Sequence, residues 1–385
     1  MALLRKPKGT HFFNQPFQSR VSRSIGARLD FAMAFVILLI IGIGLLNLYS
    51  SVESSPAKSG LFTSQVQWYV ICCLAMIVVY AINYHFYDAA AYWLYGAAVV
   101  LLILVLVVGK TAKGSSRWIE LGFFSFQPSE LSKIAFTLCL ARYFSQYPKT
   151  EGYRLGDLAI PFGLLAVPTI LMLMQPDLGT AMLHVLIFGS VCIFVGLRLR
   201  TLLGLGFTAI AAAPLMWFFG LKDYQRTRIL TLLDPESDPL GSGYHIRQSL
   251  IAIGSGRFIG KGYLHGTQTR LQFLPEQHTD FIFSVLSEEW GFLGAAFVLI
   301  LFFALIVWGV SVAARSKDNF GSILAFGMVS IVFWHVFINV GMALGIMPVV
   351  GVVLPFFSYG RTAIFTMLVA VTLLLNINSR RSMFE

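Results

Sequence analysis

Charged residues are scarce in this chain of 385 residues. Only 12% of the residues are Asp, Glu, Lys or Arg, 57% are hydrophobic, and the mean hydropathy is +0.76. Soluble globular domains carry about 25% charged residues, so this composition excludes a soluble protein. The apolar runs also lack the ~10-residue alternating segments of a transmembrane β-barrel. The sequence therefore predicts an all-α polytopic membrane protein.

Cysteine is equally scarce. The four cysteines fall inside apolar segments, without CxxC or Cys/His spacing. We interpret them as small hydrophobes and not as disulfide partners or metal ligands. No small-residue cleavage site separates the first apolar run from a soluble domain, so we expect that run to be a retained start-transfer helix.

Ten apolar runs are candidates for membrane-spanning helices, each of which needs ~20 residues. We expect one membrane domain over 31–378, with a basic N-terminal tail over 1–30, a C-terminal tail over 379–385 and one long extracytoplasmic loop over about 221–280. The expected spans lie at about 31–50, 64–82, 91–109, 128–147, 158–174, 179–197, 201–220, 281–310, 321–343 and 359–378.

The basic residues predict the orientation. With both termini in the cytoplasm, the inside segments hold 15 Lys and Arg residues and the short outside loops hold 5, as the positive-inside rule requires. The net charge of +10 then reflects orientation and contact with anionic membrane lipid. We expect no nucleic-acid partner.

The long loop breaks the positive-inside rule. Its glycines between Gly254 and Gly266 can bring backbone N–H groups close to an anion, and Asp280 stands where the polar loop meets an apolar helix. Cations and an acid on one loop indicate chemistry on an anionic substrate. The loop carries seven basic residues: Lys222, Arg226, Arg228, Arg247, Arg257, Lys261 and Arg270.

Asp280 heads a possible polar stripe. At 100° per residue, Ser284 and Ser287 lie within about 40° of Asp280, and Glu288 lies about 80° from Asp280. This pattern predicts a polar face leading from the loop into the membrane. The alternative is structural, because Thr279 or Asp280 can equally cap the helix.

Two expected helices begin with Pro and an acid, at 126–130 and 174–177. Pro suits the first helical turn, and an acid favours the positive end of a helix, so simple capping explains part of both motifs. Lys133 follows Glu130 by three residues and shares its helix face. An ionisable pair inside a membrane segment is a candidate functional site.

Two other outside loops contain residues that indicate a structural or functional role. Arg117 and Trp118 predict either interfacial anchoring or a functional role. The segment 345–360 is apolar but broken by Gly and Pro, and we expect it to be buried as the wall of a cavity, because non-helical backbone needs protein cover at membrane depth. His265, Glu276 and His278 are candidate ligands for a divalent cation such as Mg²⁺ or Mn²⁺, although their spacing is not a three-ligand helical pattern.

Long motifs occur in a fixed order along the chain. They resemble those of the SEDS (shape, elongation, division, sporulation) family from about residue 30 to the C-terminus. The motifs are KGSSRWIELG at 113–122, FQPSELSKIA at 126–135, QPDLGTA at 175–181, DYQRTRILTLLDPESDPLGSGYHIRQSLIAIGSG at 223–256, GKGYLHGTQTRLQFLPEQHTDFIFSVLSEEWG at 260–291 and NVGMALGIMPVVGVVLPFFSYG at 339–360.

The resemblance implies a ten-span peptidoglycan glycosyltransferase of the bacterial inner membrane. Such an enzyme polymerises lipid II at the outer face during cell elongation and rod-shape maintenance, beside a class B penicillin-binding protein that cross-links the strands. The resemblance also implies that Asp280, within HTDFIF, is catalytic, and we expect it to act as a general base. Beside it we expect a substrate-binding set of Arg117, Trp118, Glu130, Lys133, Arg226, Arg228, Lys261, His265, Glu276, His278 and Ser358.

One position departs from the family pattern. Members usually have a second glycine after Ser358-Tyr359-Gly360, where this chain has Arg361. A bulky cation there puts the expected packing at the top of the last helix in doubt. The alternative function is a lipid II flippase, but a transporter places ionisable groups near the membrane midplane, whereas the charges of this chain gather towards one face.

Overall fold

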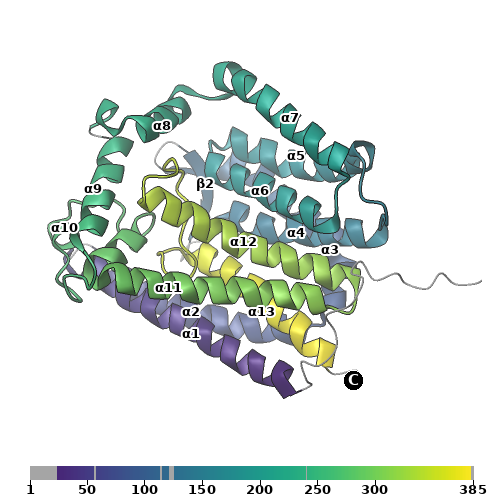
Figure 1. The fold of residues 1–385 in the computed structure, drawn as a ribbon, viewed down its shortest axis with the longest axis horizontal. Helices are drawn as coiled ribbons and strands as arrows, with labels where there is room; N and C mark the ends of the chain where they lie inside the picture. Colours follow the sequence, from purple (N-terminus) through teal and green to yellow (C-terminus); the bar gives the residue numbers. More distant parts are fainter. Residues whose placement is uncertain (1–23, 56–57, 113–114, 121–124, 240, 383–385) are drawn as a thin grey trace, which may run out of the picture.

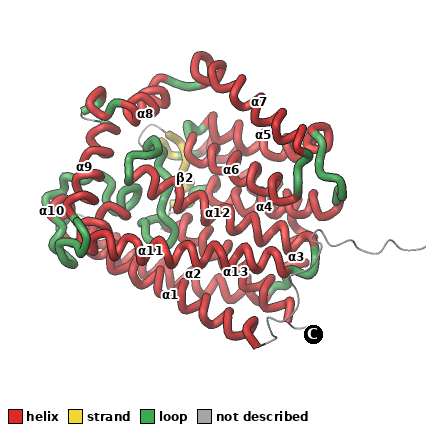
Figure 2. Tube along the Cα trace, viewed as in Figure 1, coloured by secondary structure: helices red, strands yellow, loops and turns green. Residues whose placement is uncertain are grey.

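The protein is a bundle of helices in its computed structural model, which describes residues 24–55, 58–112, 115–120, 125–239 and 241–382 (Figures 1 and 2). Each of the ten expected spans coincides with a helix, which confirms the all-α prediction. The helices are α1 (Ser24–Glu53), α2 (Ser59–Ala81), α3 (Tyr84–Val108), α4 (Pro128–Gln146), α5 (Ala159–Met174), α6 (Leu178–Val195), α7 (Leu199–Leu215), α11 (Ile282–Arg315), α12 (Asn319–Ala343) and α13 (Arg361–Ser382).

Eight of these helices, with α5 counted from residue 155, are long and apolar enough to cross a membrane. The two others are α4, which carries Glu130, Lys133 and Arg142, and α7, which has 17 residues. The charges on α4 are tolerated because this helix is buried on nearly all sides: residues 128–141 are all buried except Leu131. A helix that is covered by protein does not have to present an apolar surface to lipid.

The centre of the bundle is α12. It packs against α4, α6, α11 and α13, while α13 packs against α2 and α1 packs against α11. Along α12, Leu324, Met328 and Ile331 are completely buried. By contrast, α7 lies at the periphery (Figure 1). The central position of α12 places its polar residues inside the molecule.

Short elements gather at one end of the bundle, opposite the C-terminus (Figure 1). We call this end the loop end. The long loop folds into α8 (Asp223–Leu233), η4 (Pro235–Ser237), α9 (Ser242–Ser255) and α10 (Thr267–Arg270). The remaining short turns are η2 (Leu155–Leu158) and the π-helical η3 (Met216–Gly220).

A small antiparallel sheet lies where the sequence predicted only a loop. Strands β1 (Lys110–Ala112), β2 (Ser115–Glu120) and β3 (Ser125–Phe126) follow the order β1-β2-β3. Register pairs Lys110 with Trp118 and Ile119 with Phe126. The sheet therefore fixes the direction in which Arg117 and Trp118 leave the backbone, which a flexible loop would not do.

The helix α11 is interrupted near the loop end. Gly291 has φ 64° and ψ −164° inside the helix, a conformation that is essentially restricted to glycine. The long loop crosses at this point: Lys261 N–H donates to Glu288 O over 3.1 Å and Gly262 N–H to Glu289 O over 3.0 Å. The break at Gly291 separates the first nine residues of α11, 282–290, from the rest of the helix.

The broken segment 345–360 enters the bundle between α12 and α13. Val352, Leu354 and Phe357 are buried in it, and Tyr69 of α2 donates its hydroxyl to Phe356 O over 2.8 Å. Its backbone is therefore covered by protein and hydrogen-bonded, as predicted for non-helical backbone at this depth.

Candidate functional site

Asp280 lies just before α11. The helix begins at Ile282 with Phe281 as its N-cap, and the Phe281 side chain makes no capping hydrogen bond. The Thr279 hydroxyl donates to Glu276 O over 3.3 Å. The N-cap position thus belongs to Phe281 and not to Thr279 or Asp280, the two residues expected there. Asp280 itself is partly exposed.

The segment 345–360 approaches the Asp280 side chain. Gly351 has φ 74°, and a Cβ built on it would lie 3.8 Å from Asp280 Oδ2. The preceding residue, Val350, approaches α6: its carbonyl oxygen would lie 2.5 Å from a Cβ built on Gly179, at the start of that helix. The turn at 350–351 therefore stands between the Asp280 carboxylate and the first residues of α6.

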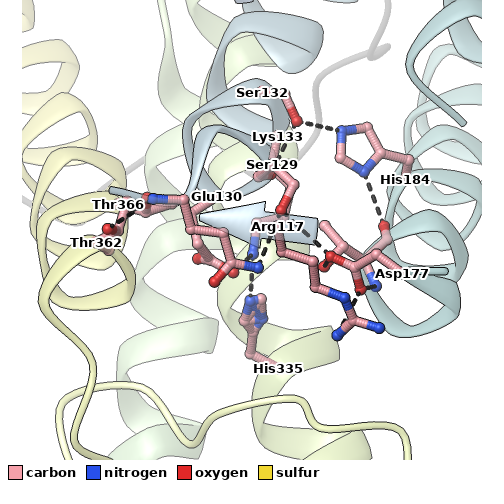
Figure 3. Close-up of polar contacts among 12 residues, drawn as sticks. Arg117, Ser129, Glu130, Ser132, Lys133, Asp177, His184, His335, Thr362 and Thr366 are labelled. Carbon is pink, nitrogen blue, oxygen red and sulfur yellow. Dashed lines mark hydrogen bonds and ion pairs between the residues drawn. The ribbon is translucent and has the colours of Figure 1, made fainter. Parts of the chain in front are cut away.

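Asp177 organises the start of α6. Its carboxylate accepts hydrogen bonds from Thr180 N at 3.3 Å and Thr180 Oγ1 at 2.9 Å, so the prediction that an acid caps this helix is confirmed. Pro176 precedes the cap and does not lie in the first turn. The same carboxylate forms an ion pair with Arg117 at 3.5 Å, and the Arg117 guanidinium also donates to Pro176 O (Figure 3). The Arg117 side chain remains 26% exposed, so this cation is accessible at the loop end.

The predicted pair on α4 forms. Lys133 Nζ donates to Glu130 Oε1 over 2.8 Å, and the Lys133 side chain is fully buried. Sequence reasoning missed the third member, because Lys133 Nζ also lies 2.7 Å from Nε2 of His335 on α12 (Figure 3). A histidine in an otherwise apolar helix was the only signal for this contact.

A second buried histidine lies nearby. His184 on α6 contacts Ser132 Oγ at 3.1 Å and Thr180 O at 2.9 Å (Figure 3). Both ring nitrogens have protein partners, so His184 ties α4 to α6 as a packing residue. A hydrogen bond of 3.4 Å from Ser129 Oγ to Asp177 Oδ2 joins the same helices.

The Gly-rich part of the long loop binds the carboxylate of Glu288, an acid of the protein itself. Glu288 is fully buried, and its carboxylate accepts from Lys261 Nζ over 2.7 Å and from the backbone N–H of Gln268 over 3.0 Å. Gly266 permits this approach, because a Cβ there would lie 2.9 Å from Glu288 Oε2. The glycines thus pack the loop onto α11 around Glu288.

The predicted polar stripe on α11 is not open. Ser284 is buried and shares a 2.7 Å hydrogen bond with Ser249 of α9. Ser287 is also buried and donates to Phe283 O over 2.8 Å. The Ser284 hydroxyl ties α11 to α9 and the Ser287 hydroxyl bonds within α11, so the part of the stripe beyond Asp280 does not form a substrate-facing surface.

The cations of α8 lie apart from the α4 pair. Arg226 donates to Phe218 O over 2.9 Å and pairs with Asp223 at 3.5 Å, and the Arg228 guanidinium lies 5.8 Å from the centre of the Tyr224 ring. The principal contacts of α8 are with η4 and α9. The structure therefore places Arg226 and Arg228 on a separate helix of the loop, whereas Arg117 and Lys133 pair with residues of the bundle.

The remaining candidates divide between two places. His278 and Ser358 adjoin Asp280, and the Ser358 hydroxyl donates to Thr279 O over 2.6 Å. His265 is exposed on the long loop, with Nδ1 at 2.8 Å from Tyr263 O. Within the described ranges no three His, Cys, Asp or Glu side chains gather in a way that would hold a metal ion. The three residues expected as cation ligands are therefore not gathered into one such group.

Arg361 and the cysteines lie outside the sites described above. Arg361 donates to Ser64 Oγ over 3.1 Å and lies 5.9 Å from the centre of the Trp68 ring, so its side chain packs against α2. All four cysteines are free, three buried and one exposed.

Comparison with known proteins gives consistent matches over most of the chain. The family profile for FtsW, RodA and SpoVE, described as "Cell cycle protein", matches residues 30–383. Peptidoglycan glycosyltransferase MrdB of Escherichia coli K12 is 42% identical over 358 residues, which cover 93% of this chain and 95% of MrdB.

Solved structures share the fold. A chain of a structure described as "Structural coordination of polymerization and crosslinking by a peptidoglycan synthase complex" superposes with a TM-score of 0.80 at 33% identity, covering 91% of this chain and 98% of that one. The rod shape determining protein RodA of Thermus thermophilus gives a TM-score of 0.68 at 30% identity, covering 91% and 97%. A structure of an aspartate-to-alanine variant of the same RodA matches equally well, with a TM-score of 0.68.

Proposed function

The chain belongs to the FtsW, RodA and SpoVE family and is a peptidoglycan glycosyltransferase, and we propose that it polymerises lipid II with Asp280 as the general base. The observation that carries this proposal is the arrangement around the turn at 350–351. The Asp280 carboxylate adjoins Gly351 on one side of this turn, and on the other side Asp177 at the start of α6 holds Arg117.

The reaction follows from the chemistry of the substrate. The 4-hydroxyl of the acceptor sugar attacks the anomeric carbon of the donor, and a new glycosidic C–O bond forms with inversion. The bond from that carbon to the diphosphate breaks, and its electron pair leaves with the undecaprenyl diphosphate. Asp280 accepts the hydroxyl proton, a role that typically contributes ~10²- to 10⁴-fold in rate.

The leaving diphosphate needs fixed positive charge. Arg117 is suited to this role, because Asp177 fixes its position while 26% of its side chain remains exposed. Lys133 lies deeper and is fully buried. We therefore propose that its positive charge contributes to the electrostatic field of the site. Lys261 is engaged by the buried Glu288 and is assigned to loop structure.

We infer that the loop end faces the periplasm and that both termini lie in the cytoplasm of a bacterial inner membrane. The excess of basic residues on the opposite side supports this orientation. A class B penicillin-binding protein is the proposed partner, because polymerised strands require cross-linking and a structural relative is described as part of a peptidoglycan synthase complex.

The position of the buried ionisable residues favours an enzyme over a flippase. Lys133, His184 and His335 all lie in the halves of their helices nearest the loop end. A substrate carrier instead concentrates such groups near the midplane, where its half-helices meet. The substrate is therefore expected to react at one face.

The deciding experiment uses the purified full-length protein with labelled lipid II, with and without the partner transpeptidase, scored for glycan chains on a gel. We expect chains from the parent and a loss of orders of magnitude in Asp280→Asn, which keeps the shape of the side chain but removes the basic oxygen. A variant that still makes long chains at a comparable rate would show that the base is another residue, such as Glu276. Lipid II translocation in vesicles without glycan synthesis by the parent would favour the flippase.

A further inference from the structure

Three consecutive carbonyl groups in the segment that carries Asp280 are each held by a separate donor. Two donors come from the end of segment 345–360, and one comes from α12. The pairs are Tyr359 N–H to His278 O at 2.8 Å, Ser358 Oγ to Thr279 O at 2.6 Å, and Asn339 Nδ2 to Asp280 O at 2.9 Å.

The donor to Asp280 is the one that belongs to a long helix. Asn339 is fully buried on α12, one turn before the helix ends at Ala343. Its amide also donates to Val352 O over 2.7 Å. Both N–H groups of the amide are therefore used, one on each of the two irregular segments that meet at the site.

The same face of α12 contacts the buried Lys133 of α4. His335 lies four residues before Asn339, so the two side chains point in the same direction, about 6 Å apart along the helix axis. His335 Nε2 contacts Lys133 Nζ at 2.7 Å. One rigid helix thus sets the backbone of Asp280 and the position of Lys133 relative to each other.

We propose that Asn339 is a positioning residue for glycosyl transfer, which acts by fixing the backbone of Asp280 against α12. This inference rests on the proposed function, in which Asp280 is the base. Residues 275–281 are turns and not helix, so their backbone is not held by a regular hydrogen-bond ladder. Without the Asn339 amide, rotation of the backbone at Asp280 would move the carboxylate relative to the acceptor hydroxyl, and a displacement of 1 Å can cost ~10²-fold in rate.

The chain offers a matched control at the other end of the bundle. Asn376 on α13 is also fully buried. Its Nδ2 donates to three carbonyls at the end of α2: Val79 O at 3.3 Å, Tyr80 O at 2.8 Å and Ile82 O at 2.7 Å. Asn376 therefore shares the burial and the chemistry of Asn339 but has no contact with the Asp280 segment.

The test compares Asn339→Leu and Asn376→Leu with the parent full-length protein. We measure glycan synthesis against lipid II concentration, thermal unfolding and partner binding. We expect Asn339→Leu to lower kcat by ~10²-fold with KM within about twofold, whereas Asn376→Leu loses thermal stability but keeps its kcat. If Asn339→Leu does not fold, Asn339→Ser decides in the same way, because the short hydroxyl cannot reach both carbonyls.

Two results would overturn the inference. One is a folded Asn339→Leu or Asn339→Ser variant with the kcat of the parent. The other is an equal fall in kcat in the Asn376→Leu control, which would indicate a general loss of structure. Asp280→Asn is measured in parallel: if it remains active, the proposed function fails, whereas if it is inactive and the Asn339 variants are fully active, only the role of Asn339 fails.

Discussion

Lys133 on α4 donates from its ammonium group to Nε2 of His335 on α12 across 2.7 Å. An ammonium group has no acceptor, so with Lys133 charged opposite Glu130, Nε2 is the acceptor and the imidazole is neutral. The other partner of the ammonium is Glu130 at 2.8 Å. The cluster therefore places one positive and one negative charge inside the bundle, beside a neutral ring that orients the cation.

The first prediction concerns this cluster. Lys133→Met leaves the Glu130 carboxylate buried without its counter-charge, and breaking such a pair typically costs ~3–5 kcal/mol. We expect lower thermal stability and loss of glycan synthesis. The measurements are thermal unfolding of the purified protein and polymerisation of labelled lipid II.

A double variant separates the two effects. Glu130→Gln combined with Lys133→Met removes both charges, so we expect it to recover stability without recovering synthesis. If the double variant polymerises lipid II like the parent, the pair serves the fold alone.

The second prediction concerns Lys261, which the sequence offered as a phosphate ligand. Because Lys261 is paired at 2.7 Å with the fully buried Glu288, we expect Lys261→Met to lower stability by ~1–3 kcal/mol, the usual cost of removing a partner from a buried polar group. The apparent KM for lipid II should be unchanged in the folded fraction. A raised KM at unchanged stability would return Lys261 to the substrate site.

The third prediction concerns the break in α11. Gly291→Ala adds a Cβ that would clash with the backbone of Gly260, at a backbone conformation that itself costs ~1–3 kcal/mol for other residues. We therefore expect a clear fall in the unfolding temperature. Gly189→Ala is the matched control, because nothing lies within 4 Å of a Cβ at that position in α6. Equal unfolding temperatures for the two variants would contradict this account of the kink.

The fourth prediction concerns orientation. Glu236, which is exposed near Gly241, is expected to face the periplasm, and Arg380 on α13 the cytoplasm. With the native cysteines replaced, an impermeant thiol reagent added to intact cells should label Glu236→Cys and leave Arg380→Cys unlabelled. The reverse pattern would place the Asp280 site in the cytoplasm and remove the proposed access to lipid II.

The sequence alone predicted the features that depend on local patterns. Apolar runs located the ten helices, because a helix that meets lipid must be apolar over its whole span, although the protein-covered α4 is an exception to that rule. A spacing of three residues predicted the Glu130–Lys133 pair, and motif order predicted the family. Position at the loop boundary, together with the resemblance, singled out Asp280.

Tertiary structure decided which residues meet across the bundle. Lys133 and His335 are 202 positions apart, and Asn339 contacts the backbone of Asp280 from another helix. Lys261 and Arg226 looked alike in the sequence, yet one binds the buried Glu288 and the other pairs within α8. In a membrane protein a helix is apolar on several faces. Its own residues therefore do not reveal which face packs against which neighbouring helix. Only the packing of all the helices around α12 fixes those contacts, because burial makes each polar group depend on a partner supplied by a distant part of the chain.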